Sequence, residues 1–149
     1  MKNRLLAIVI ASACLLSVPA ADAKIYKAVG ATNPQTYAAN VTVYLKLNNA
    51  GATSQSFTIP ASGAVGFTFS AECSGATLGG WINVRLEVDG AIVTPYDDGY
   101  AFCSGGHSWN GNSFTAVKNL PAGTHTVRLK ATGIATTMRI DDQLLTIFD

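Results

Sequence analysis

The sequence is poor in charge and poor in basic residues. Only 13% of its 149 residues are Asp, Glu, Lys or Arg, about half the usual share of roughly 25%. The formal net charge is +1. Nucleic acid is held mainly through an excess of Lys and Arg, so this composition excludes a nucleic-acid partner. Disorder is also excluded, because 48% of the residues are hydrophobic and no long polar tract interrupts them.

The sequence also lacks a hydrophobic run long enough to cross a membrane. Residues 5–19 form an uncharged run, shorter than the about 20 residues of a membrane span. The run follows Lys2 and Arg4, and small residues end it at 21–23. This pattern predicts a cleavable signal peptide over residues 1–23, with cleavage before Lys24 or, as a second choice, after Ala20. We therefore expect a secreted or periplasmic, bacterial protein whose mature form does not span the membrane. A membrane anchor and a lipoprotein attached at Cys14 are the alternatives.

Residues 24–149 are predicted to form one domain. Without Lys2, Arg4 and Asp22 the chain carries eight basic and eight acidic residues. Thr, Ser and Asn together number 31 in the same stretch, so its solubility depends more on hydroxyl and amide groups than on charge. A balanced charge gives little steering of ionic partners, which favours a neutral partner.

Cysteine and histidine are scarce, with three and two residues. After export only Cys73 and Cys103 remain, and each lies in an Ala-x-Cys-Ser-Gly pattern. No histidine or second cysteine pair suits a zinc site. An even number of cysteines in an oxidising compartment predicts a disulfide.

Alternation of apolar and polar residues predicts β-strands along the whole mature chain. An Asp89-Gly90 pair between two such runs predicts a type I′ hairpin that brings Val88, Leu86, Ala91 and Val93 to one apolar face. The last strand changes phase at residues 141–142, which predicts a β-bulge there. The expected strands lie within residues 41–47, 55–59, 65–71, 82–88, 91–94, 114–118, 124–131 and 138–147.

This pattern predicts an all-β fold, a single antiparallel β-sandwich or jelly roll of about eight or nine strands with one disulfide. Residues 120–130 (Leu-Pro-Ala-Gly-Thr-His-Thr-Val-Arg-Leu-Lys) and 138–142 (Met-Arg-Ile-Asp-Asp) resemble the last two strands of secreted jelly-roll domains. Similar turn-and-strand segments occur in C1q/TNF-like domains and in carbohydrate-binding modules. The resemblance implies the fold, and none of those families' calcium or sugar ligands can be placed on residues here.

Residues 95–113 form the best candidate binding loop. They combine aromatic residues with four glycines and short polar residues, the composition of adaptable binding surfaces. Aromatic faces stack on sugar rings, and Asp and Asn side chains bond sugar hydroxyls. The predicted contacts are Tyr96, Asp97, Asp98, Tyr100 and Trp109. The alternative is a second small core in which the aromatics pack under the loop.

Catalytic and metal-binding patterns are weak. The stretch Gly106-His107-Ser108-Trp109-Asn110 lacks the last glycine of a nucleophile elbow. His125 is predicted to be a strand-end residue bonded to a neighbour. Asp97 and Asp98 with Glu72 could bind calcium, but a solvated acidic turn is the simpler reading, so we expect no cofactor and no metal.

The function predicted from the sequence is that of a secreted noncatalytic binding module for a neutral glycan or a cell-surface protein. The first alternative is a structural subunit of a surface assembly or filament, with self-association by exchange of a strand from residues 24–37. A small hydrolase is the second alternative.

Overall fold

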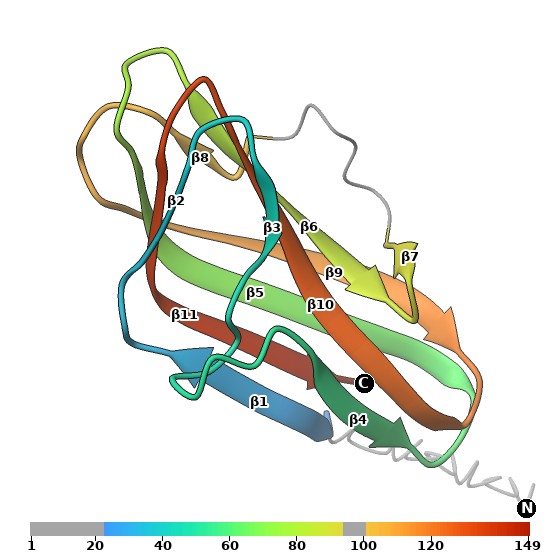
Figure 1. Cartoon of the computed structure of the whole chain (residues 1–149). Coiled ribbons are helices and arrows are strands. Elements are labelled where there is room, and N and C mark those ends of the chain that lie inside the picture. The colour runs from blue at the N-terminus through green and yellow to red at the C-terminus, as the bar shows by residue number, and fades with distance from the viewer. Residues whose placement is uncertain (1–22, 94–100) are drawn as a thin grey trace, which may run out of the picture.

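The computed structural model describes residues 23–93 and 101–149. These residues form strands and loops, with no helix among them. Eleven strands are present, more than the eight or nine predicted, because short edge strands had no pattern of their own. Two antiparallel sheets pack face to face, as Figure 1 shows where β10 crosses in front of β5 and β9. The predicted β-sandwich with one disulfide is confirmed.

The first sheet, sheet A, is centred on β5 and β11. Its order is β1-β11-β5-β9, and β2 also pairs with β11. All pairings are antiparallel. The strands are β1 (Ile25–Ala31), β2 (Gln35–Tyr37), β5 (Gly63–Gly75), β9 (Asn110–Leu120) and β11 (Met138–Phe148).

The second sheet, sheet B, is centred on β10. Its order is β3-β10-β6-β7, with β4 also paired to β10 and β8 to β6. The strands are β3 (Thr42–Tyr44), β4 (Gln55–Ile59), β6 (Trp81–Val88), β7 (Ala91–Ile92), β8 (Cys103–Ser104) and β10 (Gly123–Ile134).

The N-terminal segment expected as an exchanged strand pairs within its own chain. β1 and β2 both lie against β11, with Val29 opposite Leu145 and Thr36 opposite Arg139. The sequence showed weak alternation here because β1 is a sheet edge, where only part of each residue is covered.

The core lies between the sheets and is filled by the alternate residues of each strand. Ile82, Val84, Leu86 and Val88 of β6 are all 0% exposed. An aromatic cluster of Phe69, Phe102 and Phe114 has ring centroids 5.4–5.9 Å apart. Each such pair adds about 0.5–1.5 kcal/mol beyond its buried area.

The Asp89-Gly90 hairpin and the bulge in β11 are confirmed. Asp89 and Gly90 have φ of 53° and 79°, as a type I′ turn requires, and Val88 faces Ala91. Ala91 therefore lies on the same face as Val88, as predicted, but it is exposed, because β7 is the edge strand of sheet B. In β11 the register shifts between Asp141 and Leu144.

The disulfide joins the two sheets. Cys73 of β5 is bonded to Cys103 of β8, with Cα atoms 6.2 Å apart. The repeated Cys-Ser-Gly ends of the two patterns lie beside each other, since Gly75 forms a parallel bridge with Gly105. This end of the sandwich, at the top of Figure 1 near β8, is called the disulfide end.

Candidate functional site

Polar and aromatic side chains gather on the outer face of sheet B. Because side chains alternate along a strand, the residues between the core residues of β6 and β10 all point away from the core. We call these side chains, with two from β3, the outer strip: Trp81, Asn83, Arg85 and Glu87 of β6, Arg128, Lys130, Thr132 and Ile134 of β10, and Thr42 and Tyr44 of β3.

The strand register arranges the outer strip in rows. Trp81 faces Ile134, and Asn83 faces Thr132, which in turn faces Thr42. In the next rows Lys130 lies between Arg85 and Tyr44, and Arg128 faces Glu87. From Trp81 to Glu87 the strip is about 20 Å long at the usual rise of a strand.

Several of these outward side chains are recessed rather than exposed. Asn83 is 2% and Glu87 7% exposed, which is unusual for polar groups on the outside of a sheet. Glu87 accepts a hydrogen bond of 3.1 Å from Tyr44 Oη. The Arg128 guanidinium lies over the Tyr44 ring, 4.9 Å from its centroid. The phenol is therefore held from two sides, and its position in the strip is fixed.

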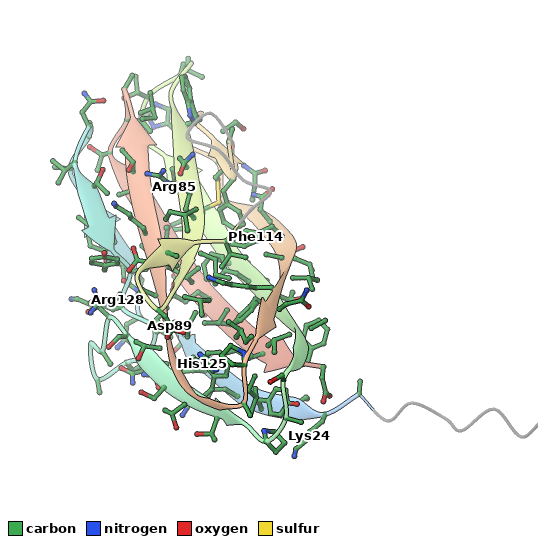
Figure 2. The ribbon with its side chains drawn as sticks, turned by 90° about the vertical axis from the view of Figure 1, so that its right-hand side faces the viewer. Lys24, Arg85, Asp89, Phe114, His125 and Arg128 are labelled. Carbon is green, nitrogen blue, oxygen red and sulfur yellow. A yellow bond between two sulfur atoms is a disulfide. The ribbon has the colours of Figure 1, made fainter. Side chains whose placement is uncertain are left out.

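Two hollows lie in line along β6 and β10. The one nearer the disulfide end has a volume of about 250 Å³ and is lined by Thr42, Asn83, Arg85, Thr132 and Ile134. The second, of about 300 Å³, is lined by Glu87, Asp89, Gly90, Thr126 and Arg128. Figure 2 shows Arg85, Arg128, Asp89 and His125 following one another down this side of the molecule. The strip is therefore an elongated, polar surface with two hollows.

A buried histidine supports the far end of the strip. His125 is 6% exposed; its Nδ1 lies 2.7 Å from Asp89 Oδ2 and its Nε2 lies 2.9 Å from the Pro121 carbonyl oxygen. The other Asp89 oxygen accepts the Thr126 N–H at 2.8 Å. Both ring nitrogens of His125 thus face acceptors, which only the doubly protonated ring can satisfy. The prediction that His125 is a bonded strand-end residue is confirmed.

The pKa values of this pair move apart. The hydrogen bonds to Asp89 and to the Pro121 carbonyl raise the pKa of His125 above its usual 6.5, against burial and the charge of Lys118. Burial raises the pKa of Asp89, but the bonds from His125 and Thr126 and the nearby positive charges outweigh it, so that pKa lies below its usual 3.8.

We expect the free energy of unfolding to be largest between pH 3.8 and 6.5 on account of this pair. Because the pKa of His125 is raised on folding, protonated His125 contributes fully to the free energy of unfolding below pH 6.5. This contribution is lost as pH rises through the pKa of the folded state. Because the pKa of Asp89 is lowered on folding, ionised Asp89 contributes fully to the free energy of unfolding above pH 3.8. This contribution is lost as pH falls through the pKa of the folded state. Urea unfolding from about pH 2 to pH 9 measures both limbs. The Asp89→Asn variant should lose about 1 kcal/mol near pH 5.5 and flatten the alkaline limb; an unchanged pH profile would contradict the assignment.

The predicted loop contacts fall mostly outside the described residues. Tyr96, Asp97, Asp98 and Tyr100 lie there, so their roles remain predictions. Trp109 is described and is 44% exposed, as a ligand contact requires. Phe102, by contrast, is 3% exposed and packs in the core, so this part of the loop follows the small-core alternative.

The flanks of residues 94–100 are bonded to the same strand that carries the strip. Val93 N–H donates to the Leu86 carbonyl oxygen, and Phe102 N–H to that of Ile82, at 2.9 and 2.8 Å. The predicted loop and the outer strip therefore share β6 as their support.

Sequence reasoning did not find the strip itself. The alternation of polar and apolar residues places Arg85, Glu87, Arg128 and Lys130 on the outer faces of their strands, but it does not show that these strands are neighbours. Trp81 precedes the expected strand and was not singled out; it is half-buried, and its Nε1 is buried without a hydrogen-bond partner. The sequence signal that could have indicated the strip is the series of charged and aromatic residues at alternate positions of β6 and β10.

The described residues do not form a catalytic triad or a group of metal ligands. The Asp89–His125 pair has two members of a Ser-His-Asp triad, but the second ring nitrogen meets the Pro121 carbonyl oxygen instead of a hydroxyl group. Among residues 23–93 and 101–149 no three His, Cys, Asp or Glu side chains are grouped as a metal site. Asp97 and Asp98, the centre of the calcium alternative, are outside those ranges. The same residues include no helix capable of crossing a membrane.

The fold and the strip define a β-sandwich with an elongated polar surface on one sheet. No family model matches the sequence, and no curated protein matches it. Solved structures that this chain resembles include two carbohydrate-binding modules.

The first of these is the module CBM6cm-2 of Cellvibrio mixtus lichenase 5A, in complex with cellotriose. It has a TM-score of 0.45 and 15% identity, over 85% of this chain and 98% of the module. The second, a family 35 module from Clostridium thermocellum, has a TM-score of 0.42 and 24% identity, over 85% and 98%. Latent PorU from Porphyromonas gingivalis has a TM-score of 0.40 and 15% identity, over 84% of this chain and 11% of PorU. At these TM-scores and identities no property of the three proteins is carried over to this chain.

Proposed function

We propose that this chain is a secreted or periplasmic, noncatalytic glycan-binding module that holds an oligosaccharide along the outer strip. The observation that carries the proposal is the pair of hollows in line on β6 and β10, bordered by amide, hydroxyl, guanidinium, carboxylate and aromatic groups. Binding sites for small ligands are typically hollows with a few well-placed polar groups. The disulfide supports an oxidising compartment.

The chemistry of the strip suits a polyhydroxy ligand. Each sugar hydroxyl both donates and accepts, so it needs acceptors such as Glu87 beside donors such as Arg128. Trp81 is half-buried, and the exposed part of its ring offers an apolar face to a sugar ring.

A glycan suits this surface better than a protein partner does. The buried centre of a protein interface is depleted in charged residues, whereas four of the ten strip residues are charged. The exposed large hydrophobic residues of the described chain are spread over different elements: Ile25, Val41, Leu78, Ile92, Trp109, Val117 and Leu144.

A threonine pair on each sheet provides the test. Thr132 Oγ1 lies 2.8 Å from Thr42 Oγ1 in the strip, and Thr68 Oγ1 lies 2.9 Å from Thr115 Oγ1 on the outer face of sheet A. We expect the full mature chain to bind oligosaccharides on a glycan array. For the best ligand, calorimetry should show a loss of about 2- to 10-fold in affinity for Thr132→Val, the equivalent of one neutral hydrogen bond.

The matched variant Thr68→Val should bind as the wild type does. The loop prediction is tested alongside, since Trp109→Ala should also weaken binding. Absence of any bound glycan, or equal effects of Thr132→Val and Thr68→Val, would overturn the proposal.

A further inference from the structure

We infer that Asp89 contacts the bound oligosaccharide at the far end of the outer strip, and that His125 positions the Asp89 carboxylate for this contact. Binding should then weaken when His125 loses a proton. The inference rests on the proposed function and adds to it one ligand contact, one positioning residue and a dependence on pH.

Asp89 forms part of the wall of the second hollow and has room for a further partner. Its side chain is 46% exposed, although Oδ2 lies 2.7 Å from His125 Nδ1 and Oδ1 accepts the Thr126 N–H at 2.8 Å. A carboxylate has about four acceptor positions on its two oxygens, so each oxygen keeps one for a sugar hydroxyl. The residues that line this hollow are Glu87, Asp89, Gly90, Thr126 and Arg128.

His125 lies behind Asp89 and does not line the hollow. It is 6% exposed, and its ring packs against the ring of Phe57 on β4, with the centroids 5.5 Å apart. Figure 2 shows His125 beside Asp89 on the side of the molecule that carries Arg128. A buried ring in this place can influence a bound ligand only through Asp89, which makes His125 a positioning residue.

The contacts of His125 require both ring protons. The doubly protonated ring donates from Nδ1 to Asp89 and from Nε2 to the Pro121 carbonyl oxygen, at 2.7 and 2.9 Å. A neutral ring has one N–H, so one of these contacts would then bring two acceptors together. Either the ring or the turn that holds Asp89 must move to relieve this repulsion, and in both cases the ion pair with Asp89 is lost. The carboxylate in the wall of the hollow is then less firmly held.

The charges around His125 agree with this direction. The hydrogen bonds to Asp89 and to the Pro121 carbonyl raise the pKa of His125 above 6.5, against burial and the charge of Lys118 on β9. On the β4 side the ring faces Phe57, which carries no charge. We therefore expect full binding below pH 6.5 and a loss of binding as pH rises through the pKa of the folded state.

The Glu87–Arg128 pair does not account for such a dependence. The two residues face each other across β6 and β10 and line the same hollow. Neither is bonded to His125, whose ring nitrogens face Asp89 and Pro121. The pair is thus the same in both protonation states of His125.

The test measures the affinity of the full mature chain for uncharged probes as pH changes. The probes are cellohexaose, xylohexaose, mannohexaose and galactohexaose, which have no group that titrates between pH 5 and 9.5. For the hexasaccharide that binds most tightly, we expect calorimetry to show about tenfold weaker binding at pH 9.5 than at pH 5, the equivalent of one hydrogen bond to a charged group.

Matched variants assign the effect to one histidine. His125→Asn can still donate to Asp89 but does not titrate, so its affinity should be the same at both pH values. His107→Asn makes the same change at the other histidine of the chain, which is exposed, and should keep the tenfold difference. Thr132→Val lies in the other hollow and should weaken binding equally at both pH values.

A measurement on the wild-type chain keeps the inference testable if a variant does not fold. Linkage is reciprocal, so the bound hexasaccharide must favour protonated His125 as much as the proton favours binding. In NMR spectra, saturation with the hexasaccharide should raise the midpoint of the His125 titration by about one pH unit, the counterpart of a tenfold change in affinity.

Equal affinity at pH 5 and 9.5, an unchanged midpoint on binding, or a tenfold difference that persists in His125→Asn would each overturn the inference. If a hexasaccharide binds without any dependence on pH, the proposed function stands while this inference fails. If no hexasaccharide binds, this inference fails, and the array decides the proposed function separately.

Discussion

Replacing Gly105 with Ala is expected to reduce the free energy of unfolding by about 3 kcal/mol or more, the range of substitutions that force backbone to move. A Cβ atom at Gly105 would lie 2.1 Å from the Thr77 carbonyl oxygen and 2.7 Å from that of Gly80. Both are backbone atoms, and Gly105 N–H donates to the Gly80 oxygen at 2.6 Å. The clash therefore cannot be relieved by a side-chain rotation.

Gly111 provides the control for this substitution. A Cβ atom there would meet nothing within 4 Å, so Gly111→Ala should change stability by less than about 0.5 kcal/mol. Urea unfolding of both variants with the disulfide intact measures the difference. Equal stability of the two variants would show that the segments at the disulfide end are not packed as the structure has them.

Removing the disulfide is expected to cost about 3–4 kcal/mol, the chain-entropy value for the loop that it closes. Cys73 and Cys103 are separated by 30 residues. The bond also ties β8 to sheet A, and β8 borders the strip because Ser104 faces Trp81. The double variant Cys73→Ala, Cys103→Ala should therefore unfold at much lower urea concentration and bind glycan more weakly.

Chemical reduction controls for the lost side chains in that experiment. Reducing agent should lower the unfolding midpoint of the wild type and leave the double variant unchanged. A wild-type midpoint that does not respond to complete reduction of the bond would contradict the expected role of the disulfide.

Much of the fold could be predicted because its determinants are local. The hairpin turn at Asp89-Gly90, which needs positive φ angles, and the bulge at Asp141-Asp142 are each determined by a few neighbouring residues. The disulfide could be predicted from the even number of cysteines in the mature chain and from the expected export to an oxidising compartment. The strands β1, β2 and β8 were not predicted as strands of the sandwich, because a strand at an edge or of two or three residues leaves little alternation.

The outer strip could not be predicted, because it depends on which strands are neighbours. Lys130 and Arg85 are 45 positions apart and come together only through the pairing of β10 with β6. Nothing local in the sequence specifies that register. The candidate loop, residues 95–113, had a compositional signal, and only its part from residue 101 on can be compared with the structure.

The claim that the outer strip is a glycan-binding surface is tested most directly by mapping backbone amide shifts in NMR spectra during titration with the best oligosaccharide from the array. The account predicts that the perturbed amides follow β6 and β10, from Trp81 to Glu87 and from Arg128 to Ile134, and extend to Trp109. Amides of the outer face of sheet A, such as Thr68 and Thr146, should not shift. Perturbations confined to sheet A, or none along β6 and β10 at saturation, would contradict the account.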